Sequence, residues 1–209
     1  MKIKDLKIEL LTALQPRMEK SGFKLQKSKE RFAKRVDSGA WWFVLDFTVY
    51  ENLHVKPAIG LRVDAVESIF HRTSGFEGKY QSDTPTLSLS VQSLMGDPSK
   101  FEYVLRSLDD VSVVAAQIEV DFVGIVLPYL ERHSELSEID RTLNENPEGE
   151  CVHYAMDYLR SAHGVIVAQL VGRPEYSELV ETYRRKLALI SNGFYLPKFE
   201  ALVADLVPS

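Results

Sequence analysis

Residues 40–50 alternate between two sets of side chains more regularly than any other stretch, and this alternation constrains the fold most. Apolar side chains occupy the odd positions from Trp41 to Val49. Because successive side chains of a β-strand point to opposite faces, the pattern predicts a strand with one face in the core. Residues 54–63 alternate again after a polar turn, so the two stretches predict an antiparallel hairpin. Pro57 cannot donate an amide hydrogen bond, which predicts an edge or a bulge near it.

An amphipathic helix and a shorter hairpin are expected before these two strands. Apolar residues recur every four positions from Leu6 to Met18, which predicts a helix over residues 4–20. Ser21-Gly22 would end this helix. Residues 23–36 then return to a period of two around a polar turn and predict the first hairpin of the sheet.

The middle of the chain predicts a short helix and two more strands. Residues 66–70 fit a short helix, and residues 74–85 are rich in Gly, Ser and Asp, as is typical of a loop. Leu, Leu and Val alternate with polar residues over 87–91, which predicts a fifth strand. Residues 101–106 are expected to form a sixth.

A long helix is expected to begin at Asp109 or Asp110, whose carboxylates can accept hydrogen bonds from the free amides of a first turn. The apolar spacing continues to about Leu127. Pro128 then either stops the helix or kinks it near Gly124, because proline lacks an amide proton and its ring crowds the preceding turn.

From Ser134 onward the sequence predicts helices alone, the later ones over residues 149–171, 174–190 and 197–206. Gly or Asn follows each helix and Pro opens the next, which are the usual stop and start signals. Strands therefore precede helices, and the expected class is α+β. The expected architecture is an N-terminal helix, an antiparallel sheet of about five to six strands with a long helix packed on it, and an all-helical C-terminal part.

The weakest seam in the sequence is the polar stretch 144–149, which reads Asn-Glu-Asn-Pro-Glu-Gly. It predicts a sheet domain over residues 1–145 and a helical extension over residues 146–209 that packs on the same core. The apolar faces of the C-terminal helices could equally form a homodimer, and the sequence leaves both arrangements open.

The composition indicates the cellular compartment in which the protein is expected to fold. The N-terminus begins with alternating charges instead of the apolar segment of a secretory signal, and no stretch approaches the roughly 20 apolar residues that span a bilayer. The lone Cys151 excludes an internal disulfide and a cysteine-built metal site. A cytoplasmic protein that does not enter membranes is therefore expected.

The five histidines also lack the spacing of a metal site, such as two His four residues apart around a Glu. Paired carboxylates such as Asp109-Asp110 and Glu148/Glu150 fall at expected helix starts, where capping explains them. No metal, cofactor or catalytic residue is therefore predicted.

Cys151 and His153 nevertheless offer a nucleophile and a base two residues apart. On the helix expected there, two residues subtend about 200°, so their side chains diverge and cannot hydrogen-bond each other. We interpret the pair as an inert cysteine beside a surface histidine.

His71 and Arg72 precede a loop, Gly75–Lys79, that superficially resembles a phosphate-binding loop. Its two glycines are too close together, and no Ser or Thr follows the lysine, so the spacing is wrong for that function. A surface loop is the plain interpretation. For the alternative that the chain is an enzyme, the candidate site residues lie around this loop: His71, Arg72, Tyr80 and Asp83. His71 and Arg72 are also candidates for binding a partner.

Trp41 and Trp42 are consecutive in a strand, so they must point to opposite faces. One belongs to the core. The other is covered by the C-terminal helices or anchors a partner, as exposed aromatic residues do at interfaces. The face of Trp42 also carries Asp46, Thr48 and Tyr50, and these four residues form the candidate binding surface.

Charge is divided unevenly along the chain. Residues 1–40 hold eleven of the 25 Lys and Arg but only five of the 30 Asp and Glu. Basic residues from Lys24 to Arg35 would cover the first hairpin, with Trp42 or Tyr50 beside them for stacking on a base. A charged edge hairpin also discourages strand addition, and the acidic remainder is opposite to the usual nucleic-acid footprint, so nucleic acid is an unlikely partner.

Three short stretches resemble an uncharacterised bacterial family, domain of unknown function forty-three-oh-four. They are Gly22-Phe23-Lys24 before the charged hairpin, Trp41-Trp42-Phe43 in the strand, and Leu127-Pro128-Tyr129-Leu130 at the end of the long helix. The resemblance covers about residues 1–145. It implies a helix packed on an antiparallel sheet and a bacterial intracellular protein, with no catalytic residues to carry over.

The leading functional hypothesis is a non-enzymatic module that binds another protein. By analogy of size, class and charge, it is similar to the immunity proteins that neutralise bacterial toxins, and its acidic bulk would suit a basic toxin. The first alternative is an enzyme whose site is assembled from residues far apart in sequence. The second is nucleic-acid binding through the basic hairpin.

Overall fold

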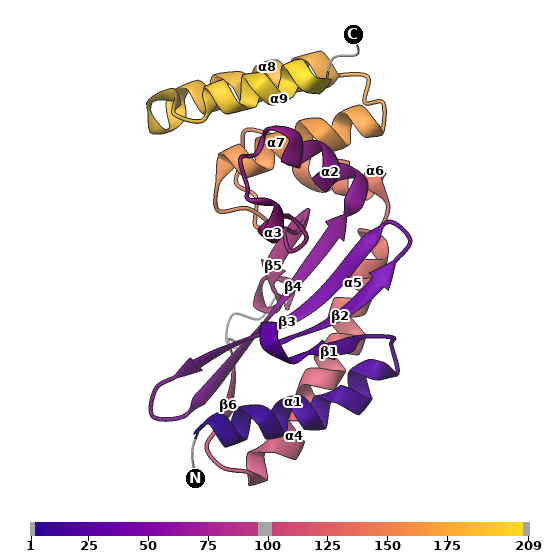
Figure 1. Cartoon of the computed structure of the whole chain (residues 1–209), viewed down its shortest axis with the longest axis vertical. Helices are drawn as coiled ribbons and strands as arrows, with labels where there is room; N and C mark the ends of the chain where they lie inside the picture. Colours follow the sequence, from indigo (N-terminus) through magenta and orange to yellow (C-terminus); the bar gives the residue numbers. More distant parts are fainter. Residues whose placement is uncertain (1–2, 96–101, 207–209) are drawn as a thin grey trace. The chain divides into compact units, whose positions relative to one another are not determined.

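The structure, a computed structural model, describes residues 3–95 and 102–206. It confirms the α+β class. Along the chain, helices precede and follow the strands of one antiparallel sheet (Figure 1). The chain folds into two compact units. The sheet unit comprises Met1–Leu61 and Ser88–Glu131, and the helical unit comprises Arg62–Leu87 and Arg132–Ser209.

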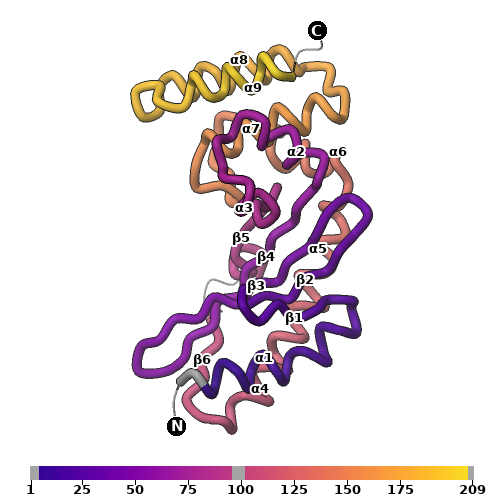
Figure 2. Tube along the Cα trace, in the orientation of Figure 1, coloured from indigo at the N-terminus to yellow at the C-terminus, as the bar shows by residue number. Residues whose placement is uncertain are grey.

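The sheet follows the order β1-β2-β3-β4-β5, and β6 pairs with the start of β4. Antiparallel register is set by pairs such as Lys24↔Ala33 in β1–β2 and Phe32↔Phe43 in β2–β3. The strands are β1 (Lys24–Gln26), β2 (Arg31–Val36), β3 (Gly39–Val49), β4 (Leu53–Val63), β5 (Leu87–Ser90) and β6 (Tyr103–Leu105). The tube in Figure 2 shows β3 and β4 as one long hairpin, as the alternating pattern predicted.

The core of the sheet unit forms where two helices cover the strands. The helix α1 (Ile3–Glu19) packs on α4 (Asp109–Asp121), and its leucine stripe from Leu6 to Met18 is buried as predicted. The ring of Phe122 lies edge-on to Phe23 and Phe43, with ring centroids 5.1 and 5.0 Å away. A single aromatic cluster therefore joins the end of α4 to the sheet.

Capping begins the long helix where the sequence predicted. The Asp110 carboxylate accepts hydrogen bonds from the amides of Arg106 at 2.7 Å and Ser107 at 3.0 Å, and these bonds lower the pKa of Asp110. Ser107 Oγ in turn accepts from the amide of Asp109 at 3.2 Å. Ser107 and Asp110 thus form a reciprocal cap of the kind found at many helix starts.

Pro128 does not stop this helix. A π-helical turn, η3 (Phe122–Val126), lies between α4 and α5 (Leu127–Arg132), and Pro128 is inside α5. The proline cannot donate to the carbonyl of Gly124, four residues earlier, and a widened turn relieves the clash of its ring with that carbonyl. The sequence predicted either a stop or a kink near Gly124. The helix continues, and the π-helical turn lies where the kink was predicted.

The helical unit is built from helices that pack on α7. The buried side chains of its core include Val165, Tyr183, Leu187, Phe199 and Leu202. Its members are α2 (Asp64–Thr73), α3 (Gly78–Gln81), α6 (Leu136–Asn144), α7 (Asp157–Leu170), α8 (Tyr176–Leu189) and α9 (Leu196–Leu206). Short 3-10 turns lie at η1 (Lys27–Lys29), η2 (Val91–Leu94) and η4 (Ile190–Gly193).

The helix predicted over residues 149–171 is too long, because α7 begins only at Asp157. The buried guanidinium of Arg160 donates to the carbonyls of Leu143, Asn146 and Gly149, and so holds the preceding segment in turns. Glu148 and Glu150 therefore lie in a turn and cap no helix. Similarly, α6 begins at Leu136 with Glu135, instead of Ser134, in the N-cap position.

The division into units also differs from the predicted seam at residue 145. The helical unit starts at Arg132 and includes residues 62–87, which leave the sheet after β4 and return as β5. Residues of α2 pack on α7 and α9, so this excursion belongs to the helical core. The contacts of α2 with α7 and α9 join residues far apart in sequence, so no local sequence pattern predicts this division into units.

Candidate functional site

Glu67, on α2, is fully buried at the centre of a polar cluster in the helical unit. Its Oε1 accepts a hydrogen bond from Thr86 Oγ1 at 2.8 Å and lies 3.0 Å from His163 Nε2. Its Oε2 accepts from Thr84 Oγ1 at 2.6 Å. The loop before β5 and the helix α7 thus both supply hydrogen-bonding groups to this carboxylate.

The hydrogen-bond pattern assigns the protons of this cluster. His163 Nδ1 lies 2.8 Å from the carbonyl oxygen of Leu159, which can only accept, so this nitrogen carries a proton. Burial opposes ionisation of Glu67, but the hydrogen bond and the charge of His163 outweigh it, and the pKa of Glu67 lies below its ordinary value. Glu67 and His163 therefore form a buried hydrogen-bonded pair, with Oε1 and Nε2 3.0 Å apart.

His71, a residue singled out from the sequence, closes the same cluster. Its Nε2 lies 2.8 Å from Thr84 Oγ1, and its Nδ1 lies 3.0 Å from Ser74 Oγ. Burial lowers the pKa of His71 despite the nearby charge of Glu67, so the ring is neutral at pH 7. Arg62 Nη1 completes the cluster by donating to the Thr84 hydroxyl at 3.0 Å.

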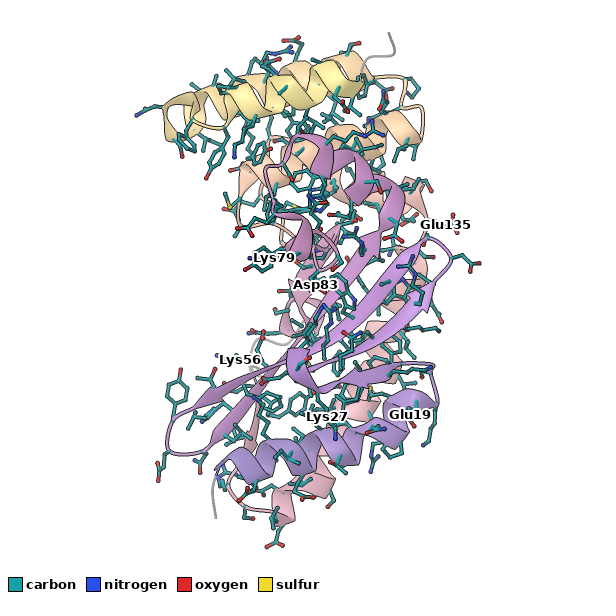
Figure 3. The ribbon with its side chains drawn as sticks, viewed as in Figure 1. Glu19, Lys27, Lys56, Lys79, Asp83 and Glu135 are labelled. Atoms are coloured by element: carbon teal, nitrogen blue, oxygen red, sulfur yellow. The ribbon has the colours of Figure 1, made fainter. Side chains whose placement is uncertain are left out.

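Every polar atom named in this cluster has a partner, and its side chains are almost completely shielded from solvent. An active site needs an acid, base or nucleophile with free capacity facing a substrate, which this saturated arrangement does not offer. The other loop candidates point elsewhere: Arg72 pairs with Asp205 of α9 at 3.2 Å, and Tyr80 is 55% exposed beneath Lys79. Figure 3 labels Lys79 and Asp83 on this loop. The cluster therefore has a structural role: its hydrogen bonds hold α2, α7 and the loop before β5 together inside the helical unit.

Cys151 and His153 lie in the turn segment before α7, not on a helix as predicted. His153 is buried, and its ring centroid lies 6.4 Å from that of His133. Burial, with the charges of His133 and Arg160, lowers the pKa of His153 to about 4. His153 is thus a buried neutral histidine and not the surface histidine that the sequence suggested.

The predicted binding face on β3 is divided. Trp42 is only 5% exposed, and the guanidinium of Arg31 covers its ring at 4.3 Å. Asp46 is exposed and Thr48 is half-buried. Tyr50 is 66% exposed, with its ring edge-on to His54. Only the outer end of this face is open to a partner.

The basic hairpin is likewise partly engaged within the fold. Arg31 donates to Gln26 Oε1 at 2.7 Å and stacks on Trp42, so neither side chain is free to hold a base. The Lys34 ammonium lies 5.2 Å from the ring centre of Trp41. These contacts occupy Trp42, one of the two aromatic groups predicted to stack on a base, whereas Tyr50 stays exposed.

A groove of about 870 Å³ lies within the sheet unit, between α4 and the strands β4 and β6. Pro57, Val91 and Met95 form one apolar wall. The opposite wall is a row on α4 that contains Val113, Ala116 and Val120. This volume falls in the range of ordinary ligand-binding clefts.

The row on α4 continues beyond the groove into η3 as an exposed apolar stripe. Val113, Val120 and Val123 are 57%, 69% and 54% exposed, and Ala116 lies between the first two. The spacing of three, four and three residues keeps all four on one side of the helix. It is the spacing by which helices pack on each other.

Polar groups gather at one end of the groove. Tyr103 donates a hydrogen bond to the Asp121 carboxylate, and burial together with this carboxylate raises the pKa of Tyr103 far above its ordinary value. Glu102 lies 2.6 Å from His54 Nδ1 and 3.5 Å from Lys56 Nζ. Lys56 is labelled on the hairpin in Figure 3.

The charge of α4 is wholly acidic. Its thirteen residues carry Asp109, Asp110, Glu119 and Asp121 and no Lys or Arg. Glu119 is paired with Arg17 of α1 and with Lys20, which directly follows α1, on the packed side of α4. The groove side therefore combines exposed valines with an acidic border.

Comparisons with known proteins leave the site to be interpreted from its own residues. No family model, curated protein or solved structure matches the chain. The resemblance to domain of unknown function forty-three-oh-four thus stays a prediction.

The helix from Asp109 to Arg132 is long and apolar enough to cross a membrane by length and composition alone. One such helix is weak support for a membrane protein, since core helices pass the same test. Here one side of the helix, including Val114 and Ile118, is buried in the core of the sheet unit. Among the described residues, no group of three His, Cys, Asp or Glu could hold a metal ion.

Sequence reasoning missed both the groove and the Glu67 cluster. Val113, Val120 and Val123 were visible as apolar residues of the long helix, and a helical projection would have shown that they fall opposite the core stripe. Glu67 and His163 are 96 residues apart and carry no spacing signal.

Proposed function

We propose that this chain is a non-enzymatic protein-binding module, and that its groove holds a basic, apolar helical segment of a partner protein. The exposed valine stripe on α4 carries the proposal. Monomeric proteins rarely expose a continuous apolar row beside a hollow, and such surfaces usually mark interaction sites.

The spacing of the stripe favours a helix as the occupant. Val113, Ala116, Val120 and Val123 follow the alternating three- and four-residue steps that accept the side chains of a second helix. The small side chain of Ala116 lets that helix approach closely.

Charge favours a basic partner. The groove lining holds the carboxylates of Glu102 and Asp121 against one lysine, Lys56, and α4 adds no positive charge. Opposite charge at the border steers association and rejects acidic competitors. The same acidity disfavours docking on anionic lipid headgroups. A toxin neutralised in the manner of immunity proteins is the narrower form of this proposal.

The test uses two synthetic amphipathic helices of about 20 residues, one with Leu and Lys and the other with Leu and Glu. Fluorescence anisotropy with labelled peptide measures binding at moderate salt. The Lys peptide should bind and the Glu peptide should not, because only the first matches the acidic border.

Val120→Lys should weaken binding of the Lys peptide at least about tenfold, since it places a positive charge in the apolar row. Val152→Lys is the matched control, because Val152 is 71% exposed in the helical unit and Val120 is 69% exposed. Equal binding by both variants, or equal binding of both peptides, would refute a site in this groove.

A further inference from the structure

The turn between α8 and α9 presents two large apolar side chains to solvent. Leu189 is 85% exposed and Phe194 is 68% exposed, and they flank the turn η4. Figure 1 shows α8 and α9 running side by side as a helical hairpin that this turn closes. We call Leu189–Phe194 the apolar tip.

The backbone of the apolar tip is tightly defined. Ser191, Asn192 and Gly193 all have positive φ, at 49°, 52° and 74°. Non-glycine residues adopt this left-handed conformation uncommonly, and two in succession require surrounding structure to hold them. That structure is present, because the Tyr195 ring stacks on Tyr158 with centroids 5.2 Å apart and lies 5.0 Å from Phe194.

Basic residues surround the apolar tip. Between Glu181 and Glu200 the chain contains Arg184, Arg185, Lys186 and Lys198 and no acidic residue. Arg184 and Lys186 are held in ion pairs with Glu200 and Asp157. Arg185 is 70% exposed and lies only 3.5 Å from an equally exposed Glu148 carboxylate, which is a weak attraction in water.

The apolar tip and the groove are complementary in chemistry. One presents a leucine and a phenylalanine, each four residues in sequence from an exposed basic residue, Arg185 or Lys198, and the other presents valines within an acidic border. We infer that the groove of one copy of this chain binds the apolar tip of a second copy.

This inference rests on the proposed groove and names its occupant. Because the two surfaces are different, the contact is heterologous, so a dimer keeps a free tip on one copy and a free groove on the other. Association therefore continues into larger oligomers unless the geometry closes a ring. The small area of one tip predicts a weak contact, with a Kd between about 1 μM and 1 mM.

The test measures oligomerisation by sedimentation velocity over a concentration series. The tip variant is Leu189→Ser with Phe194→Ser, the groove variant is Val120→Lys, and Val152→Lys is the control. All these positions are exposed, so circular dichroism should show unchanged folding. Wild type and the control should associate with rising concentration, and each surface variant alone should remain monomeric.

Mixing the two variants gives the decisive result. The tip variant keeps an intact groove and the groove variant keeps an intact tip, so an equimolar mixture should form a one-to-one dimer and nothing larger. A wild type that stays monomeric at millimolar concentration overturns the inference. So does a tip variant that still associates, or a mixture that stays monomeric.

The Leu and Lys peptide separates this inference from the proposed function. If the peptide binds the groove but wild type does not self-associate, the groove stands and its occupant is another protein. If wild type self-associates and Val120→Lys has no effect, the groove itself is wrong. Binding of the tip to anionic vesicles without self-association would assign the tip to a lipid surface and overturn the inference.

Discussion

His153 should make the helical unit lose stability as pH falls through a defined window. The side chain is 8% exposed and faces His133, and burial is the main reason that its pKa falls from 6.5 to about 4. In the unfolded chain the ring has its ordinary pKa. Between pH 6.5 and about 4, the unfolded state therefore binds a proton that the folded state does not.

The sign and the size follow from this difference. The contribution of neutral His153 to the free energy of unfolding is fully present above pH 6.5. It decreases as the pH falls to about 4, by up to about 1.4 kcal/mol per pH unit. Integrated from about pH 7.5 to about pH 4.5, the loss is about 2.5 kcal/mol. This is a large part of the stability of an ordinary domain.

Urea unfolding at several pH values measures the effect, with far-ultraviolet circular dichroism reporting the helices of both units. Both tryptophans lie on β3, so their fluorescence follows the sheet unit and serves as an internal control. His153→Gln cannot take up the proton and should flatten the pH dependence of the helical transition. If His153→Gln keeps the wild-type slope between pH 6.5 and 4.5, the burial argument is refuted.

Two further changes test the packing of the helical unit. Glu67→Gln should cost about 1–3 kcal/mol, because an amide can accept hydrogen bonds at only one of its two terminal atoms and so breaks part of the buried network with Thr84, Thr86 and His163. The exposed Glu77→Gln should cost almost nothing; urea unfolding compares the two, and equal effects would contradict the buried network. Gly164→Ala should cost about 1–3 kcal/mol, because the added Cβ would lie 2.5 Å from Asn144 Oδ1 and 3.0 Å from Tyr183 Oη. Gly124→Ala has no atom within 4 Å of the added Cβ and should be neutral or slightly stabilising by thermal unfolding. A Gly164→Ala protein as stable as wild type would contradict the tight packing at that position.

Local signals in the sequence were sufficient for most of the elements. The leucine stripe of α1, the alternation of β3 and β4, and the start of α4 at Asp109 each depend on residues a few positions apart. Gly172 and Gly193 end α7 and lie after α8 in the left-handed conformation that a glycine adopts at low cost. These predictions succeeded because neighbouring residues decide them.

Long-range contacts decided the rest. The start of α7 depends on Arg160 reaching back to carbonyls 11 to 17 residues earlier, which no helix propensity describes. Alternation places Trp42 opposite Trp41, where the sequence predicted cover by the C-terminal helices or a role in binding a partner, yet Arg31 stacks over it. The groove depends on the valines of α4 lying beside residues of β4 and η2, and the sequence alone does not bring these segments together.

Residues 62–87 belong to the helical unit, so during translation they are synthesised well before the helices on which they pack. Glu67 leaves the ribosome 96 residues before His163, its buried partner. At ordinary rates of translation this interval lasts about 5–20 s. During that time α2 has no α7 to pack on, and its apolar side stays available to chaperones or to neighbouring nascent chains. Slow codons placed between these two points would lengthen the exposure, so the yield of folded protein should be sensitive to codon choice there more than near the end of the gene.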